Sequence, residues 1–391
     1  MKPTSQCRDD RTKFLIEETN EDIYINIDGD AGLSPGDVFV FGQSILETTG
    51  LPNGITSGQC VVLEDVNVTD NLYCTMNFDF PEGSIVLQGV FYKTTVVSGT
   101  DCYAGLHGKN SPSLRTNGFE HNITKDDGLS QYECPHQLLT TTWIESSGDT
   151  YVDSDRSGSV TPGDLFVFDS NRISMGDNGM IVGTVSGICI VMPRVNGITF
   201  CLISIENSTV GTLTAMGSFS SMTITGGTGC FVGISGVVQG ESHPQGFAYS
   251  LSVDSQDVES AYLLQHCTVD IFDTTWIHRG EDVFIDHNGD GLESPGEMYL
   301  IDNRSVQTGL FVDGLAVGHC VLLGKDVSTT YCRINFSFPE GTVAAIGFIE
   351  TMVIVGASGC FRPAAGGLMK GTIVDGTYSY TFELDRSYKS F

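Results

Sequence analysis

A twelve-residue acidic loop is the segment of this chain whose residue types could most directly do chemistry. In residues 286–297, side-chain oxygen atoms fall at positions 1, 3, 5, 9 and 12, and a glycine stands at position 6. This is the Asp-x-Asp-x-Asp-Gly pattern of calcium loops, in which hard oxygen atoms surround the ion and the glycine permits a sharp turn. The expected ligands are Asp286, Asn288, Asp290 and Glu297.

Two similar loops lie upstream. Their expected ligands are Asp153, Asp155, Ser157 and Asp164 in one loop, and Asn26, Asp28, Asp30 and Asp37 in the other. A polar Asp/Gly turn without an ion is the alternative for all three loops, and Ala31 replaces the glycine in the first. A proline at position 10, followed directly by a strand, excludes the helix pair of an EF-hand. We therefore expect up to three Ca2+ ions, one for each loop.

Twelve cysteines show that the loops belong to a repeated unit. Their gaps are 53, 14 and 28 residues, then 55, 12 and 29, then 53, 12 and 28. The Pro-Gly-Asp/Glu end of the acidic loop keeps the same phase, so the chain is a triplication. We expect units at residues 1–133, 134–266 and 267–391, each close to the common size of a domain.

An even number of cysteines at repeated spacing favours disulfide bonds over buried free thiols. No Cys-x-x-Cys pair occurs, which argues against zinc and thioredoxin-like chemistry. The second and third cysteines of each unit flank a hairpin at separations of equal parity, so they share one sheet face. We expect the pairs Cys60–Cys74, Cys189–Cys201 and Cys320–Cys332 and, by elimination, Cys7–Cys102, Cys134–Cys230 and Cys267–Cys360.

Charge and composition exclude several classes of protein. The 391 residues include 48 Asp and Glu against 19 Lys and Arg, a formal net charge of −29, which argues against nucleic acid and anionic membrane as partners. A hydrophobic content of 40% supports folded cores. Residues 342–361 are apolar, but Glu350 and several glycines interrupt them, so we expect two strands and a turn rather than a membrane span.

The disulfide pattern predicts an extracellular location. Asn-x-Ser/Thr sequons, a weak signal, are compatible with it at Asn67, Asn122, Asn207, Asn303 and Asn335. Residues 1–6 lack the apolar core of a signal peptide, so secretion would require a mature or trimmed form of the chain.

Short β-branched or aromatic segments alternate with glycine-rich turns, for example at residues 37–41, 84–91 and 377–384. Few segments show a helical period. About eight short strands per unit predict an all-β protein of three tandem small antiparallel β-barrels, because closure removes exposed edges. Residues 110–133 and 254–265 are polar and are the expected linkers.

The series Pro35-Gly36-Asp37, Gly58-Gln59-Cys60-Val61 and Gly83-Ser84-Ile85-Val86 resembles the allene oxide cyclase-like barrel, a fold that dirigent proteins share. In the second unit, residues 224–233 carry the corresponding Gly-Gly-Thr-Gly turn. The resemblance extends over most of each unit and implies an eight-stranded antiparallel barrel that commonly assembles as a trimer. Three barrels in one chain would then form either a fused pseudo-trimer or a linear string.

The pocket residues of that family do not map consistently onto the three units. The resemblance assigns the pocket asparagine to Gln43, Ser170 and Asn303, the first-strand glutamate to Glu17, Glu145 and His278, and the pocket cysteine to Cys60, Cys189 and Cys320. Because the units differ at all but the cysteine, which is expected to be bridged, we assign no catalytic residue. Trp143 and Trp276 are expected to pack inside the barrels.

Two functions follow as hypotheses. The first is a secreted structural, adhesive or matrix-type protein of three disulfide-bridged, calcium-stabilised barrels, with self-association or an extracellular matrix partner. The second is a cyclase- or dirigent-like protein that binds a small apolar ligand in a barrel. A carbohydrate-binding module would need an aromatic platform that the sequence does not offer. A barrel interior filled by Phe, Ile and Met favours the first hypothesis, and converging polar groups favour the second.

Overall fold

The computed structural model describes residues 13–17, 23–27, 33–48, 51–63, 72–103, 106–115, 118–125, 142–146, 150–175, 180–193, 199–207, 210–244, 246–253, 271–276, 283–286, 293–295, 297–309, 312–322, 330–361, 367–374 and 377–384. The expected all-β class is confirmed, because the chain forms three successive antiparallel sheets. Four described 3-10 turns join some of the strands: η2 (Phe91–Lys93), η3 (Asp101–Tyr103), η6 (Gly229–Phe231) and η8 (Gly359–Phe361).

Each sheet belongs to one of the expected units. The first contains β1 (Lys13–Glu17), β2 (Ile23–Ile25), β3 (Val38–Thr48), β4 (Leu51–Val62), β5 (Leu72–Phe80), β6 (Gly83–Val90), β7 (Thr95–Gly99), β8 (Gly108–Asn110), β9 (Ser113–Arg115) and β10 (Gly118–Lys125). The second contains β11 (Trp143–Ser146), β12 (Thr150–Val152), β13 (Leu165–Met175), β14 (Met180–Val191), β15 (Thr199–Asn207), β16 (Gly211–Ser218), β17 (Ser221–Gly227), β18 (Gly236–His243) and β19 (Gly246–Val253). The third contains β20 (Ile271–Trp276), β21 (Val283–Ile285), β22 (Met298–Thr308), β23 (Gly314–Leu322), β24 (Thr330–Phe338), β25 (Gly341–Phe348), β26 (Thr351–Ala357), β27 (Gly367–Val374) and β28 (Thr377–Leu384).

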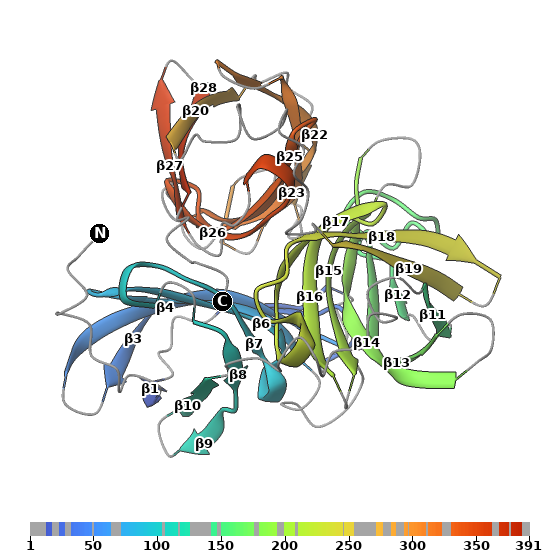
Figure 1. Ribbon diagram of the computed structural model, residues 1–391, viewed down its shortest axis with the longest axis horizontal. Coiled ribbons are helices and arrows are strands. Elements are labelled where there is room, and N and C mark those ends of the chain that lie inside the picture. Colours follow the sequence, from blue (N-terminus) through green and yellow to red (C-terminus); the bar gives the residue numbers. More distant parts are fainter. Residues whose placement is uncertain are drawn as a thin grey trace.

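Every sheet is a meander that curls back on its first strand. β1 pairs with β10 and β3, β11 pairs with β19 and β13, and β20 pairs with β28 and β22. Two of the sheets form closed eight-stranded barrels, and one forms a curled half-barrel. Figure 1 shows the third sheet almost end-on, as a ring. Pairing around a ring leaves few free edge groups, which suits a chain of many short strands.

Aromatic and aliphatic side chains fill the interior of each sheet. In the third, Phe336 and Phe338 of β24 point inward, and Phe272 stacks on Phe382 at a centroid distance of 4.7 Å. The first and second sheets enclose clusters of the same kind. This is the packed interior that the structural hypothesis requires.

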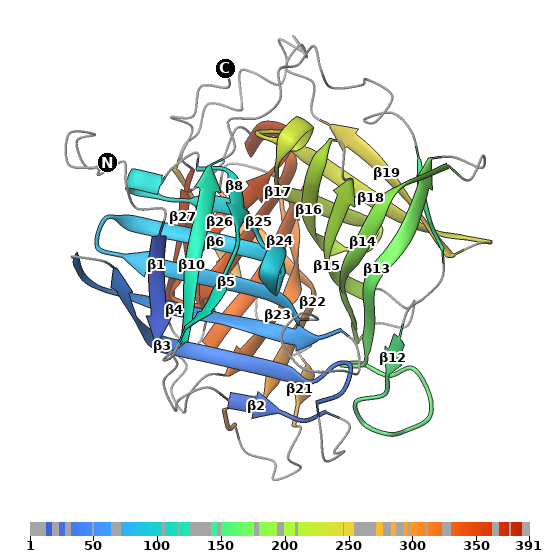
Figure 2. The same cartoon turned by 90° about the horizontal axis from the view of Figure 1, so that it is seen from below.

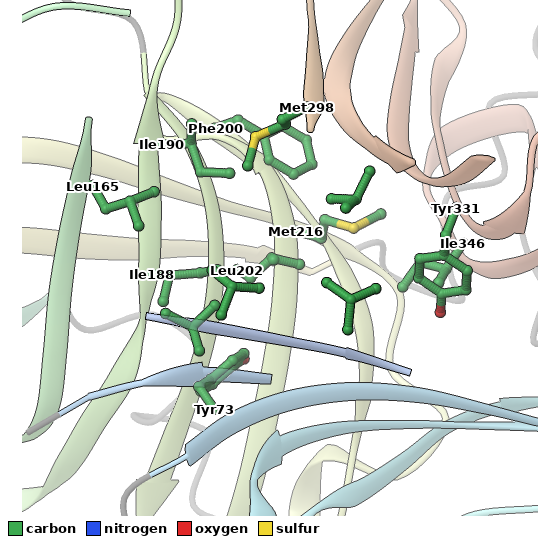
Figure 3. Packing of buried hydrophobic residues seen from close by; sticks show 14 of the residues in the cluster. Tyr73, Leu165, Ile188, Ile190, Phe200, Leu202, Met216, Met298, Tyr331 and Ile346 are labelled. Atoms are coloured by element: carbon green, nitrogen blue, oxygen red, sulfur yellow. The ribbon is translucent and has the colours of Figure 1, made fainter. Parts of the chain in front are cut away.

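A further apolar core lies outside the barrels, where the three sheets meet. It joins Tyr73 of the first unit, Phe200 and Leu202 of the second, and Tyr331 and Ile346 of the third, and Figure 3 shows these side chains converging from their separate strands. Strands at this junction are buried on both faces, so burial along β15 and β24 is nearly continuous rather than alternating.

The three units are arranged around a pseudo-threefold axis. The equivalent strands β7, β17 and β26 each contact the other two. A Cβ on Gly226 would lie 2.9 Å from the Cα of Val97, and one on Gly356 would lie 2.3 Å from the carbonyl oxygen of Ile224, so glycine is needed for this close approach. Ser98 donates a hydrogen bond of 2.9 Å to a main-chain carbonyl of the third unit. The units therefore form a compact pseudo-trimer, as Figures 1 and 2 show, and not a linear string.

Two predictions about segments can be compared with the strands. Residues 342–361 form β25, β26 and η8, as expected. Residues 110–125, expected as part of a linker, instead contain β9 and the closing strand β10, because Phe119, His121 and Ile123 alternate toward the interior of the sheet. The proposed unit boundaries and residues 254–265 lie outside the described residues.

Candidate functional site

The acidic loop of the second unit, residues 153–164, connects β12 to β13 and is described throughout. The two carboxylate oxygens of Asp153 accept the backbone N–H groups of Ser157 at 3.1 Å and Gly158 at 2.7 Å. Asp155 accepts the same Ser157 N–H at 2.9 Å, and the Ser157 hydroxyl donates to the Ser159 carbonyl. Gly158, at position 6, has a φ of 73°, in the left-handed region that glycine adopts without strain. The sharp turn lies where the motif places it.

Three predicted ligands of this loop lie together. One carboxylate oxygen each from Asp153, Asp155 and Asp164 falls within 4.8 Å of the other two. Asp155 is exposed, Asp153 is half-buried and Asp164 is buried, so the group is open to solvent on one side. Clustered hard oxygens are the donors that Ca2+ prefers, and loop carbonyls and water commonly complete its six to eight ligands.

The acid at position 12 also closes the loop against the sheet. Asp164 accepts the Tyr151 hydroxyl at 2.7 Å, the Thr161 N–H at 2.6 Å and the Ser154 N–H at 2.9 Å. Burial alone would raise the pKa of Asp164, but these hydrogen bonds outweigh it and lower the pKa below its usual value. Both oxygens of Asp164 therefore hold the loop together, a role that the sequence pattern did not indicate.

The first unit contains the same arrangement, in which the acid at position 12 accepts hydrogen bonds from its own loop and from a tyrosine hydroxyl. We call this arrangement the clamp. Asp37 is fully buried and accepts the Ile27 N–H at 2.9 Å, the Ser34 N–H at 2.8 Å and the Tyr24 hydroxyl at 2.6 Å. Of the other predicted ligands in this loop, Asn26 is half-buried, and Asp28 and Asp30 lie outside the described residues.

In the third unit the clamp is incomplete. Glu297 is 1% exposed, and its Oε2 accepts the Ser294 N–H at 2.7 Å, but its Oε1 has no hydrogen-bond partner among the described residues. Phe284 stands where Tyr24 and Tyr151 stand in the other units and brings no hydroxyl. A buried carboxylate oxygen without a donor is destabilising, and a cation would compensate it. Asp286 is half-buried, and Asn288 and Asp290 lie outside the described residues.

Each described loop ends in a Pro-Gly turn that touches another unit. Gly36 and Gly163 have φ angles of 93° and 97°, as the third residue of a type II turn requires. A Cβ on Gly36 would lie 2.8 Å from Val152 of the second unit, and one on Gly163 would lie 3.0 Å from Ile285 of the third. The loops therefore lie at the junctions between units.

Disulfide bonds cross the hairpins at the expected places. Directly opposed cysteines form the bridges Cys60–Cys74, Cys189–Cys201 and Cys320–Cys332, and all three bridges face the interior of their sheets. Cys102, Cys230 and Cys360 are also disulfide-bonded. Their predicted partners Cys7, Cys134 and Cys267 lie outside the described residues, so that pairing stays a prediction.

A buried polar group stands at the mouth of the second barrel. Glu145, 1% exposed, accepts hydrogen bonds from Asn171 Nδ2 at 2.7 Å and from the Tyr249 hydroxyl. Nearby along the same strand, the indole N–H of Trp143 is buried and finds no acceptor in the described part of the chain. Polar groups thus converge in one barrel that is otherwise filled by apolar side chains.

The polar residue beside Glu145 is Asn171, one residue after the position that the sequence comparison assigns, Ser170. A β-bulge separates Phe168 from Asn171, and Ser170 within it has a φ of 52° and is exposed. The bulge turns Asn171, rather than the predicted Ser170, toward Glu145. Sequence spacing does not reveal this bulge, because residues 169–172 are all polar and no apolar residue marks the change of register.

The strand register also corrects which first-strand residues of the three units are equivalent. Glu145 pairs with Ile173, and the equivalent residues of the other units are Ile16, which pairs with Leu46, and Trp276, which pairs with Val306. Glu17 is therefore one residue out of register, and Trp276 does not correspond to Trp143. The side chains of Glu17, Gln43, Asn303 and Trp276, and all of His278, lie outside what the structure describes.

The first unit holds a different polar set in its interior. Asn110 Nδ2 donates to the Thr94 hydroxyl at 2.9 Å and contacts His121 Nδ1 at 3.0 Å. Burial among Phe78 and Phe91 lowers the pKa of His121 to about 3, so the imidazole is neutral at physiological pH. The described interiors thus share no common catalytic set.

Two sequons are inaccessible in the folded chain. Asn335 is fully buried and accepts a hydrogen bond from Thr223 of the second unit, and Asn207 is 7% exposed. Asn122 is exposed, whereas Asn67 and the side chain of Asn303 are outside the described residues. Burial of these two side chains disfavours their glycosylation in the folded protein, and modification of the sequons stays a prediction. Among the described residues, no helix is long and apolar enough to span a membrane.

No protein-family model matches the chain, and no curated protein matches it. Among solved structures, a chain described as pyocyanin demethylase is similar over 29% of this chain and 97% of its own length. The two are 19% identical, with a TM-score of 0.26. A similarity at this level carries no argument about fold or function, so the interpretation depends on the geometry described above.

Proposed function

We propose that the chain is a non-enzymatic structural protein of the extracellular space, in which three barrel-like units form one rigid block. The observation that carries the proposal is the shared apolar core between units, because it makes the pseudo-trimer a single packed body rather than three modules on linkers. Disulfide bridges within each interior add to its durability. Self-association or attachment to an extracellular matrix is the corresponding role.

Calcium is proposed as the second element of this rigidity. The Asp153, Asp155 and Asp164 oxygens support a site in the second loop, and the unpartnered Glu297 Oε1 supports one in the third. Because Gly36 and Gly163 at the ends of the loops pack against other units, an ion that orders a loop would also order a junction. Calcium would thereby stabilise the whole pseudo-trimer, and not only one barrel.

Titration of chelator-stripped protein with Ca2+ by isothermal calorimetry tests this proposal. We expect binding of up to three ions and loss of one site in Asp155→Asn. Asp169→Asn, outside the loops, is the matched control and should bind as the parent does. Absence of calcium binding in the parent protein would remove calcium from the proposal.

A second candidate function is supported by the Glu145 group. A small, mainly apolar ligand with one acceptor atom would satisfy the Trp143 indole N–H, in keeping with the resemblance to allene oxide cyclase-like barrels. Tryptophan fluorescence of a Trp276→Phe variant, titrated with an unsaturated fatty-acid epoxide, distinguishes the two functions. Saturable binding that Glu145→Gln abolishes would favour the ligand-binding function. No binding and no turnover is the result that the structural function predicts.

A further inference from the structure

The junction of the three units contains a buried arginine. Arg333, on the outer face of β24, is 2% exposed. Its Nη1 donates to Gln59 Oε1 of the first unit at 2.6 Å and to His319 Nε2 at 3.2 Å, and its guanidinium lies 5.8 Å from the centre of the Tyr331 ring. Burial lowers the pKa of Arg333 to about 10, which still leaves the side chain charged at neutral pH. A positive charge is therefore enclosed in an apolar core.

No carboxylate of the described residues is hydrogen-bonded to the Arg333 guanidinium. Three strand positions of each unit meet around Arg333, and they are occupied by Gln59, Tyr73 and Thr75, by Ile188, Phe200 and Leu202, and by His319, Tyr331 and Arg333. None of these nine residues is acidic. Asp79 acts electrostatically on Tyr331, but its carboxylate is hydrogen-bonded to Ser84 and Asn77 and not to the guanidinium. Buried charges in proteins are normally paired, so this arrangement requires a partner.

Within the part of the chain that the structure describes, four buried polar atoms in the same group of side chains lack hydrogen-bond partners. They are Arg333 Nε, Tyr331 Oη, His319 Nδ1 and Thr75 Oγ1. Because His319 Nε2 accepts from Arg333, its Nδ1 carries the proton, and burial next to the guanidinium holds the pKa of His319 well below its usual range. All four atoms are therefore able to donate. Thr75 lies directly opposite Gln59, and His319 lies directly opposite Arg333. Because Arg333 is hydrogen-bonded to Gln59, these two strand pairs face each other across one interface.

We propose that this group is a binding site for a buried monovalent anion, with chloride as the ligand. One chloride ion would accept from the orphaned donors and neutralise the guanidinium, whereas water would satisfy the donors and leave the charge unpaired. A monatomic halide also suits apolar walls better than sulfate or phosphate, because a multivalent oxyanion loses far more hydration on burial. The ion would join the first and third units at the centre of the pseudo-trimer, independently of calcium and of the proposed structural role.

The test is thermal unfolding of the full chain at constant ionic strength and constant calcium, with sodium chloride replacing sodium gluconate. We expect Tm to rise in a saturable way with chloride, by about 2 °C or more, since a ligand that binds only the folded state stabilises it by mass action. Bromide should act in the same way. Arg333→Met should lose the dependence, and the control Arg172→Met, a substitution on the exposed surface of β13, should keep it.

Crystals of the unaltered protein grown in bromide keep the proposal testable if Arg333→Met does not fold. An anomalous bromide peak beside Arg333, Tyr331 and Thr75 is the expected result. A Tm that does not respond to halide, a response that persists in Arg333→Met, or a site occupied by water alone would each overturn the proposal.

Discussion

At the scale of single residues, the acids of the loops have two different roles that a metal-binding motif does not separate: one at position 12 and one at position 3. Asp37 and Asp164 are buried and fully engaged by donors of their own loop, whereas Asp155 is exposed and bound by fewer groups. The first kind of carboxylate stabilises the loop with or without an ion. The second kind contributes mainly when an ion is present.

Replacement of Asp164 by Ala should therefore destabilise the protein even in chelator, because the Tyr151 hydroxyl and the Ser154 and Thr161 N–H groups lose their common acceptor. We expect a loss of about 2 kcal/mol in the free energy of unfolding, measured by urea denaturation in EGTA. Asp155→Ala is the matched control, and its stability in EGTA should be close to that of the parent. Equal stability of both variants in EGTA would show that Asp164 is a ligand only.

The lowered pKa of Asp164 predicts the direction in which its contribution to the free energy of unfolding changes with pH. Because hydrogen bonds hold its pKa in the folded chain below the ordinary value of about 3.9, its stabilising contribution is complete at higher pH and is lost as the pH falls through the folded pKa. The difference in unfolding free energy between parent and Asp164→Asn, without calcium, should be largest near pH 7 and should shrink below about pH 4. A difference that widens on acidification would contradict this assignment.

At the scale of elements, one β-bulge decides which polar residue enters the second barrel. Ser170 adopts a left-handed conformation that costs a non-glycine residue about 1 kcal/mol, and this places Asn171 beside Glu145. Ser170→Gly should therefore raise the free energy of unfolding by up to about 1 kcal/mol, whereas Ser170→Ala should give no gain. Chemical denaturation measures both. A larger gain in the alanine variant would mean that the backbone conformation is not the cause.

The sequence predicts those strands and hairpins whose side chains alternate regularly between the two faces of a sheet. The hairpins, the bridges between opposed cysteines and the strands of residues 342–361 follow from parity and alternation, and the fold class follows with them. The sequence predicts a linker where the closing strand β10 lies, because polar residues obscure the alternation of Phe119, His121 and Ile123. The Asp164 clamp and the position of Asn171 depend on hydrogen bonds and a bulge that spacing does not encode.

At the scale of the whole molecule, the axis of the pseudo-trimer tolerates little added volume. A Cβ on Gly356 would lie 2.3 Å from the backbone oxygen of Ile224 in another unit, so neither side can move without shifting a strand. Gly356→Ala should lower the free energy of unfolding by about 2 kcal/mol or more. Gly309→Ala, where no atom lies within 4 Å of the new Cβ, should be nearly neutral by the same assay. Equal effects of the two changes would argue against close packing at the axis.

The account of the molecule as one calcium-stabilised block is tested most directly by differential scanning calorimetry of the oxidised chain, with Ca2+ and with EGTA. Shared packing between the three sheets predicts a single cooperative transition under both conditions, and calcium loops at the unit junctions predict that the whole transition moves to higher temperature with Ca2+. Separate transitions for the three units, or a single transition at the same temperature with and without calcium, would contradict the account.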